Sequence, residues 1–318
     1  MKKLALLIPE GKSSPLAITG VSTICKLGQQ YGLAIDYKIL STQKEAHLDA
    51  GKFILKSDER IEQGAFYDFL IIPSIIGPVD DSLRLNKDLC AFVKNSYEKG
   101  SKIISMCTGA YLLAETGLLD GYEASSHYAA IDDLKNRFPQ VHWKADKIIT
   151  DQDGLYTSGG TLSSFNVLIY LMEKYFDKEI AYSIAKVIQM DYPRNSQKPF
   201  YIFSNQKNHE DELILNIQNH LEKTLDQQIS LHQICHRFGI SRRSLNRRFK
   251  QATGENPQIY IQRIKVEQAK RWLESSGKHI NEITTNLGYQ DLESFRKVFK
   301  KISGLLPSEY RRKLKSSS

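Results

Sequence analysis

The 318-residue sequence has only four cysteines and no apolar run long enough to cross a membrane. None of the cysteines forms a CxxC pair, and no group of Cys and His residues has the spacing of a zinc site. A chain of this size does not need disulfides to fold, so we expect reduced thiols and a cytoplasmic protein without membrane contact. The sequence carries no metal or cofactor motif, and we predict neither.

The first residues imitate a secretion signal, because two lysines precede the apolar run Leu4–Ile8. This run is shorter than the apolar core of a signal peptide, and Pro9-Glu10-Gly11 ends it. We therefore expect a buried first strand at this position.

The chain has no excess of acidic residues. Its net charge is +8. From residue 208 onward, 20 Lys and Arg stand against 12 Asp and Glu, whereas residues 1–207 carry 24 of each. The whole basic excess lies in the C-terminal third, which favours a polyanionic partner for that third alone. A basic domain that is merely solvated is the alternative on charge alone.

Residues 1–190 alternate short apolar runs with amphipathic stretches. This alternation predicts an α/β domain with a mostly parallel sheet that helices cover on both faces. Residues 191–208 are polar and contain two prolines, so we interpret them as a linker, and residues 209–318 have a helical pattern throughout. The predicted strands are Leu4–Ile8, Ile35–Leu40, Phe69–Ile72 and Lys102–Ser105, and the predicted helices of the first domain include Leu85–Tyr97, Thr108–Leu118 and Phe165–Tyr175.

A repeat with an offset of 50 residues marks the C-terminal part, where Phe249–Pro257 recurs as Phe299–Pro307. Both copies read Phe-x4-Gly-x2-Pro, a pattern with a direct physical interpretation. The Phe is the last core residue of a helix, the Gly ends that helix, and the Pro begins the next one.

A short helix, a glycine turn and a second, basic helix precede each copy of the repeat. Ser241 and Asp291 are suitable N-caps for the second helices. This order predicts an all-α domain with two helix-turn-helix units, at about residues 231–252 and 280–302. The expected helices are Leu231–Phe238 and Arg242–Ala252 in the first unit, and Ile280–Leu287 and Leu292–Ile302 in the second.

Aromatic and aliphatic residues four apart give each second helix a core face, Leu245 and Phe249 in one and Phe295 and Phe299 in the other. The opposite face is basic, and in a major groove Arg recognises guanine and Asn recognises adenine. We predict that the outward residues contact double-stranded DNA. They are Arg242, Arg243, Asn246, Arg247 and Lys250, followed by Glu293, Ser294, Arg296, Lys297 and Lys300.

Residues 210–313 resemble the AraC/XylS family of transcription regulators, through Ile240–Phe249, Gly254–Pro257, Gly288–Asp291 and Gly304–Arg311. The resemblance implies seven helices, with a long one at about Ile259–Leu273 that holds the two units together. It also implies a homodimer and leaves room for a contact with RNA polymerase, although no heptad repeat supports a dimer independently. Glu293, Lys297 and Thr284 depart from the usual Ser, Arg and Ala, so the base preference of the second unit stays open.

Cys107 lies between an apolar strand and a helical stretch in Lys102–Leu113, which places it at a sharp elbow. A thiol at a helix N-terminus is expected to have a lowered pKa and to be a candidate nucleophile. The pattern resembles the PfpI-like branch of the class I glutamine amidotransferase superfamily, which implies a flavodoxin-like sheet. The resemblance continues through Gly117–Gly121, Ser125–His127 and Thr157–Gly160, and the two resemblances together are those of GlxA-like regulators.

Several residues that catalysis would need differ from the hydrolytic relatives. Thr108 replaces the usual His, Ser74-Ile75 replaces a Gly-Gly pair, and the acid near the end of the first strand is missing. Without a base, an orienting acid and an oxyanion site, a thiol is a poor catalyst. We therefore predict no enzyme activity, with Cys107 and His127 as remnants of a catalytic pair. The expected site binds a small-molecule effector through Glu10, Ile75, Ile76, Cys107, Thr108 and His127.

Three alternatives stay open for the cysteine domain. The first is a cysteine-dependent hydrolase or amidase with an appended DNA-binding domain. The second is a redox sensor that acts through a sulfenic acid at Cys107. The third is a domain with a purely structural or dimerising role.

Overall fold

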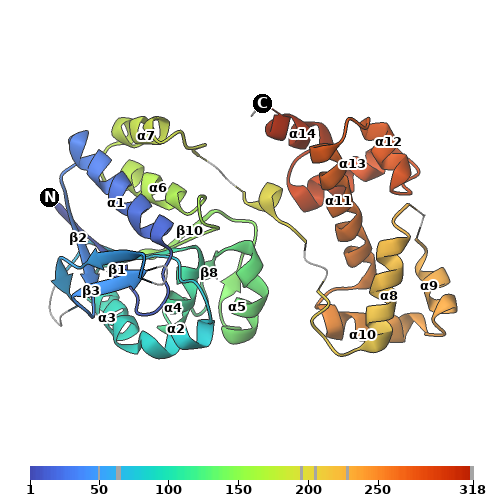
Figure 1. Cartoon of the computed structure of the whole chain (residues 1–318), viewed down its shortest axis with the longest axis horizontal. Coiled ribbons are helices and arrows are strands. Elements are labelled where there is room, and N and C mark those ends of the chain that lie inside the picture. Colours follow the sequence, from blue (N-terminus) through green and yellow to red (C-terminus); the bar gives the residue numbers. More distant parts are fainter. Residues whose placement is uncertain (49–50, 62–65, 194–195, 204–205, 227–228, 316–318) are drawn as a thin grey trace. The chain divides into compact units, whose positions relative to one another are not determined.

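The computed structural model describes residues 1–48, 51–61, 66–193, 196–203, 206–226 and 229–315. These residues form two compact units, Met1–Gln197 and Lys198–Ser318 (Figure 1). In the described part of the chain, no helix has the length and apolar character that a membrane span requires.

The first unit is built on a seven-stranded sheet with the order β10-β11-β7-β6-β1-β2-β5. Neighbouring strands are parallel except for β10 and β11. The inner order β2-β1-β6-β7-β11 is that of flavodoxin-like folds, which confirms the predicted fold class. The strands are β1 (Lys2–Ile8), β2 (Ile35–Ser41), β5 (Glu59–Arg60), β6 (Phe69–Ile72), β7 (Lys102–Met106), β10 (Ile149–Gln152) and β11 (Leu155–Ser158).

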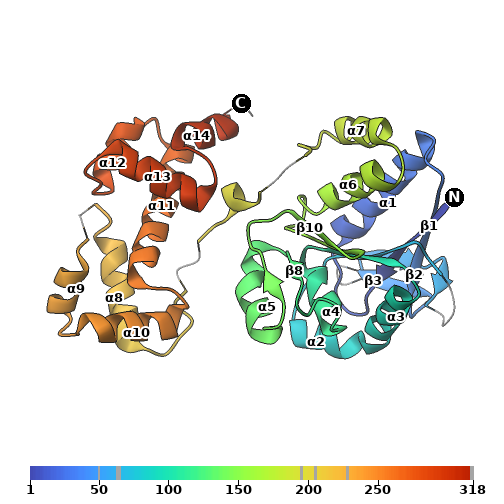
Figure 2. The same cartoon turned by 180° about the vertical axis from the view of Figure 1, so that it is seen from behind.

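Helices cover both faces of this sheet, as Figures 1 and 2 show. In β1, Leu4, Leu6 and Ile8 face one core, and Ala5 and Leu7 face the other. Because both faces are buried, the strand is an unbroken apolar run instead of an alternating one. The first core contains α1 (Pro15–Gln30), α6 (Phe165–Tyr175) and α7 (Lys178–Val187), and the second contains α2 (Val79–Leu85), α3 (Lys87–Glu98), α4 (Ala110–Glu115) and α5 (Ile131–Arg137).

The predicted helix Leu85–Tyr97 corresponds to α3, which begins two residues later at Lys87, because Leu85 is the last residue of the separate helix α2. Asn86 between them is buried, and its side chain donates to the carbonyl oxygens of Ser82 and Glu10. Strands β5, β10 and β11 of the main sheet were not predicted, and neither were two pairs of short strands, since runs of two to four residues carry little periodic signal. The pairs are β3 (Glu45–Leu48) with β4 (Phe53–Lys56), and β8 (Glu123–Ala124) with β9 (His142–Trp143).

The second unit contains seven α-helices among its described residues, the number that the family resemblance implies. The central helix α11 contributes Tyr260 and Ile264 to one small core and Val266 and Ala269 to another. Each core encloses one helix-turn-helix unit, so α11 is the shared support of both (Figure 1). The helices are α8 (Glu212–Lys223), α9 (Leu231–Arg237), α10 (Arg242–Thr253), α11 (Pro257–Ser275), α12 (Ile280–Asn286), α13 (Leu292–Ser303) and α14 (Pro307–Lys315).

The segment 191–208, predicted as a linker, contains residues that pack within the two units. Gln197 is buried in the first unit, and Phe203 is buried in the second. Residues 194–195 and 204–205 of this segment lie outside the described residues. A single buried amide and a single buried ring have no periodicity, so the sequence pattern could not reveal them.

Candidate DNA-binding and ligand-binding sites

Helix α10 presents the first set of predicted DNA contacts. Ser241 caps its N-terminus, because the Ser241 hydroxyl accepts a hydrogen bond from the Ser244 amide at 3.2 Å. Leu245 and Phe249 are fully buried, as the four-residue spacing predicts. The five outward residues, Arg242, Arg243, Asn246, Arg247 and Lys250, are all exposed.

Helix α13 presents the second set of predicted DNA contacts, with the same arrangement of N-cap, buried face and exposed face as α10. The Asp291 carboxylate accepts from the Ser294 amide at 2.7 Å and caps the helix. Glu293, Ser294, Arg296, Lys297 and Lys300 are exposed, and Phe295 and Phe299 are buried. Lys297 forms an ion pair within the helix, since its Nζ lies 2.6 Å from Glu293 Oε1, and this pair raises the pKa of Lys297.

One arginine of α10 has a structural contact that the sequence did not reveal. Arg248 donates to both carboxylate oxygens of Asp211, at 2.9 and 2.6 Å. Asp211 also caps α8 by accepting from the Ile214 amide, and the Arg248 guanidinium lowers the pKa of this carboxyl. The pair fixes α10 to the start of α8, so the Arg248 guanidinium has a structural role in orienting α10.

Lys265 on α11 holds the turn of the second unit. It is only 5% exposed, and its ammonium donates to the Leu287 carbonyl oxygen at 2.6 Å. The ammonium also lies 5.5 Å from the centre of the Tyr289 ring. Burial lowers the pKa of Lys265 to about 8. Sequence reasoning missed this lysine, because a buried lysine has no distinguishing pattern.

The Cys107 elbow lies where β7 ends. Cys107 has a φ of 54°, a left-handed conformation that is rare for a residue with a side chain. Gly109 follows at a point of close approach, since a Cβ there would lie 2.6 Å from the Pro73 carbonyl oxygen. The Thr108 hydroxyl donates to the Ile75 carbonyl oxygen at 2.7 Å, which ties the elbow to the loop after β6.

The pairing of β11 with β7 brings a second loop to the elbow. Ser158 is the partner of Met106, so the residues after each strand, Gly159–Thr161 and Cys107, meet at the carboxyl edge of the sheet. Thr161 hydrogen-bonds to the thiol. On the other side, the Ser126 hydroxyl donates to the Cys107 carbonyl oxygen at 2.8 Å.

The expectation of a lowered pKa for Cys107 was wrong. Burial raises the pKa of the thiol, and the hydrogen bonds from Thr108 and Thr161 offset this only in part. The residue is 4% exposed, and its first turn is a 3-10 turn that leads into the short helix α4, so a strong helix dipole is absent. The group is therefore mainly a neutral thiol at neutral pH.

His127 lies beside the same loops. A Cβ added to Gly160 would lie 2.8 Å from His127 Cδ2, and the His127 Nδ1 accepts from the Ala129 amide at 3.2 Å. Burial lowers the pKa of His127, which keeps the ring neutral at pH 7. Among the described residues, no hydrogen bond joins His127 to the Cys107 thiol.

The other predicted ligand-binding residues are placed unequally. Ile75 is buried next to Thr108, whereas the side chain of Ile76 is 50% exposed. The Glu10 carboxylate accepts a hydrogen bond from the Thr42 hydroxyl at 2.5 Å. Ser126 and Thr161, which contact Cys107 directly, were missed because only the three-dimensional meeting of the loops identifies them. Within the described part of the chain, no group of His, Cys, Asp and Glu is arranged to hold a metal ion.

Comparisons with known proteins match both units. The DJ-1/PfpI family matches residues 31–174, and a helix-turn-helix domain matches residues 234–313. The HTH-type transcriptional regulator GbdR of Pseudomonas aeruginosa is 23% identical over 243 residues, which cover 74% of this chain and 65% of that regulator. The chain thus matches slightly less than two thirds of the length of GbdR.

A second regulator and a solved structure are also similar to this chain. The HTH-type transcriptional regulator GlxA of Rhizobium meliloti is 23% identical over 220 residues, covering 67% of this chain and 66% of that regulator. A THiJ/PfpI family protein from Pseudomonas syringae has the fold of the first unit, with a TM-score of 0.53 and 17% identity over 64% of this chain and 80% of that one. The chain therefore joins a DJ-1/PfpI family domain to a helix-turn-helix domain of the AraC type, as the sequence resemblances predicted.

Proposed function

We propose that the protein is a sequence-specific DNA-binding transcription regulator that acts in the cytoplasm. The observation that carries this proposal is the repeated frame of α10 and α13, both capped, both packed against α11 and both exposing a polar, mostly basic face. A helix of this kind fits the major groove, and two of them on one support can read two segments of one duplex. The likeness to the HTH-type regulators GbdR and GlxA supports the same function.

Selection of binding sites from a pool of random duplexes tests this function. We expect enrichment of one two-part DNA motif, because each recognition helix contributes its own base contacts. The variant R243A/R247A should lose the enrichment. The matched control K87A/K94A removes two exposed positive charges from α3 and should enrich the same motif. Equal recovery of all sequences by the native chain would overturn the proposal.

We infer that the DJ-1/PfpI unit senses a small molecule and does not catalyse a reaction. The raised pKa of Cys107 and the neutral, separately bonded His127 support this role, because a nucleophilic thiol needs a nearby base. The proposed site lies at the carboxyl edge of the sheet and comprises Ile75, Cys107, Thr108 and His127, with Glu10 and Ile76 at its margin. The effector would change how two copies of the chain, as a homodimer, engage an operator and RNA polymerase.

A thermal-shift screen of metabolites tests the sensing role. A true effector should raise the melting temperature of the native chain and should fail to do so for C107A and H127A. Turnover of the compound by the native chain, lost in C107A, would favour the hydrolase alternative and overturn the assignment.

A further inference from the structure

Gln197 is the last residue of the first unit, and its side chain is 2% exposed. The amide nitrogen donates to the carbonyl oxygens of Ser126 at 2.9 Å and Lys147 at 3.1 Å. The amide oxygen accepts from the Gly160 backbone N–H at 3.2 Å. Both ends of this buried amide are therefore engaged with backbone groups, and a residue without an amide would leave them unpaired.

Two of these partners belong to the loops that line the Cys107 site. Ser126 donates through its hydroxyl to the Cys107 carbonyl oxygen, and Gly160 packs against the His127 ring. Space is restricted as well, because a Cβ on Gly159 would lie 2.8 Å from the Gln197 amide oxygen. Gln197 thus joins the loop after β8 to the loop after β11 and holds both in place.

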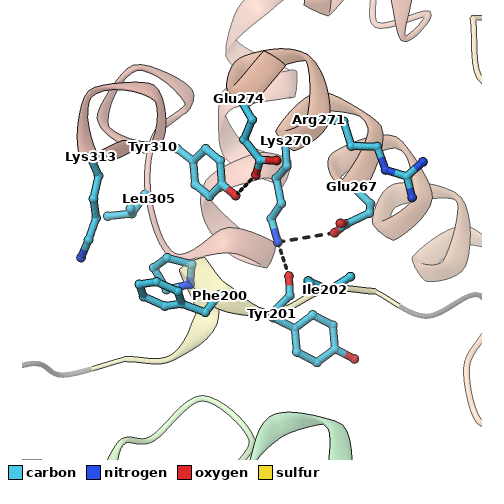
Figure 3. A pocket seen from close by; sticks show the side chains of 11 residues that line it. Phe200, Tyr201, Ile202, Glu267, Lys270, Arg271, Glu274, Leu305, Tyr310 and Lys313 are labelled. Atoms are coloured by element: carbon cyan, nitrogen blue, oxygen red, sulfur yellow. Dashed lines mark hydrogen bonds and ion pairs between the residues drawn. The ribbon is translucent and has the colours of Figure 1, made fainter. Parts of the chain in front are cut away.

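The chain enters the second unit at the next residue and is fastened there too. We call residues 199–203 the arm. Lys270 of α11 is 3% exposed and donates to the Tyr201 carbonyl oxygen (Figure 3). The Phe203 amide donates to the Glu267 carboxylate at 3.3 Å, and the Phe203 ring is buried in the first core of this unit. The arm is therefore anchored to the helix that supports both recognition helices.

Exposed and less exposed side chains alternate along the arm. Tyr201 and Phe203 contact α11. Phe200 is 46% exposed with the Lys313 ammonium 5.6 Å from its ring centre, and Ile202 is 64% exposed. A cavity of about 650 Å³ adjoins the arm, and α11 and α14 contribute to its lining (Figure 3). The arm is thus fixed by hydrogen bonds and by contacts of its aromatic rings with Lys313, Arg263 and the core of the unit, and a cavity lies beside it.

We propose that Gln197 is the positioning residue that couples the Cys107 site to the DNA-binding unit through the arm. The coupling rests on the proposed function, in which an effector occupies the Cys107 site. A ligand that moves the Ser126–His127 loop or the Gly160 loop changes the hydrogen bonds of Gln197. Lys198 alone separates Gln197 from the arm, so the displacement reaches α11 through covalent continuity and the contacts of Lys270. The element with two states is the Gln197 side-chain amide, which is either hydrogen-bonded to the two loops or released from them.

Thermodynamic reciprocity allows a test that does not need the effector. If the Cys107 site acts on the DNA-binding unit, binding of DNA must act on the Cys107 site. The probe is a duplex selected from random DNA, with a scrambled duplex of equal length as the reference. Hydrogen exchange of the full chain is followed in the peptides around Ser126–His127 and Gly159–Thr161. We expect the selected duplex to slow exchange there at least threefold.

The variant Q197M keeps the side-chain length but removes the hydrogen bonds. It should bind the selected duplex, and the loops should no longer respond to it. The control Q140M changes an exposed glutamine of the same unit and should respond as the native chain does. Should Q197M fail to fold, Q197E serves instead, since it retains an acceptor for Gly160 and loses both donors. A merely structural Gln197 would lower the melting temperature and leave the response intact.

Two results would overturn the coupling while DNA binding stands. One is unchanged loop exchange in the native chain with the selected duplex bound. The other is an equal response in Q197M and the native chain. If no duplex is selected at all, the proposed function fails, and the coupling fails with it.

Discussion

At the scale of single residues, the two recognition helices differ in how their charged side chains are engaged. On α10, Arg243 is exposed and Arg247 makes one hydrogen bond, at 3.2 Å, to the Gln251 side chain. On α13, Glu293 and Lys297 neutralise each other at 2.6 Å. A DNA base that recruits Lys297 must first compete with that pair, so α10 is the stronger candidate for base recognition.

Arg247 should therefore be a base-reading residue, and R247A should weaken binding to the selected duplex by about 1–3 kcal/mol. Discrimination against a base change at the contacted position should fall as well. The matched variant K250A removes an exposed charge that we expect to contact phosphate, and it should weaken selected and random duplexes alike. Fluorescence anisotropy on both duplexes distinguishes the two effects. An equal loss on both duplexes for R247A would remove it from the base readers.

Cys107 should alkylate slowly, because burial raises the pKa of the thiol and leaves little thiolate at neutral pH. At pH 7.5, iodoacetamide should modify Cys235, which is partly exposed, much faster than Cys107. Raising the pH towards 10 should increase the rate at Cys107, since the thiolate fraction grows. Peptide mass spectrometry measures both rates in one sample. Faster reaction at Cys107 than at Cys235 would restore the nucleophile hypothesis.

At the scale of elements, α10 and α13 end at Gly254 and Gly304, with φ values of 75° and 79°. G254A should lower the free energy of unfolding by about 1–2 kcal/mol, because L-residues are strained in this conformation. G304A should cost more, since its Cβ would also lie 3.2 Å from Lys198. The control G277A has open space and no left-handed backbone, so stability should stay unchanged or rise by less than about 1 kcal/mol.

These unfolding measurements can be confined to the helical unit. The chain has two tryptophans, Trp143 in the first unit and Trp272 in the second. In a W143F background, fluorescence during urea unfolding reports on Trp272 alone. Equal stability of G254A and G277A in this assay would contradict the role of the glycine cap.

The turn of the second helix-turn-helix unit should respond to pH through Lys265. Burial lowers the pKa of Lys265 to about 8, below its usual value of about 10.4 in an unfolded chain. Between these values the unfolded state binds more protons, so the free energy of unfolding should rise as the pH increases from 8 to 10. K265M should lose this rise. Both proteins are measured in the W143F background. If the free energy of unfolding depended on pH equally with Lys265 and with K265M, the role of Lys265 would be contradicted.

Periodic features were predictable from the sequence, and features that depend on a single contact were not. The four strands β1, β2, β6 and β7, the helix α6 at Phe165–Tyr175 and the repeated Phe-x4-Gly-x2-Pro frame all follow from patterns of apolar residues and glycine, whereas the buried strand β11 was not predicted. The elbow at Cys107 was predictable, but the pKa of its thiol depends on burial by distant loops. Lys265 and Gln197 were missed for the same reason, because each acts through backbone groups that only the fold brings near.

At the scale of the whole molecule, the two structural units differ more in net charge than the two parts of the sequence divided at residue 208. Met1–Gln197 holds 22 Lys and Arg against 24 Asp and Glu, and the rest of the chain holds 22 against 12. Attraction of the chain to a nucleic acid therefore originates in the helical unit. The first unit carries a small negative charge, so we expect it to add no affinity for phosphate.

The salt dependence of DNA binding tests this division in the full chain. Each phosphate contact that a cation makes contributes about 0.9 to the slope of log K against log salt. K250A/K300A should therefore reduce the magnitude of the slope by about 2 for each bound chain. The control K87A/K94A removes the same charge from α3 and should leave the slope unchanged, because these lysines belong to the other unit. A smaller slope in the control, measured by anisotropy from 50 to 300 mM salt, would place part of the DNA-binding surface on the DJ-1/PfpI unit.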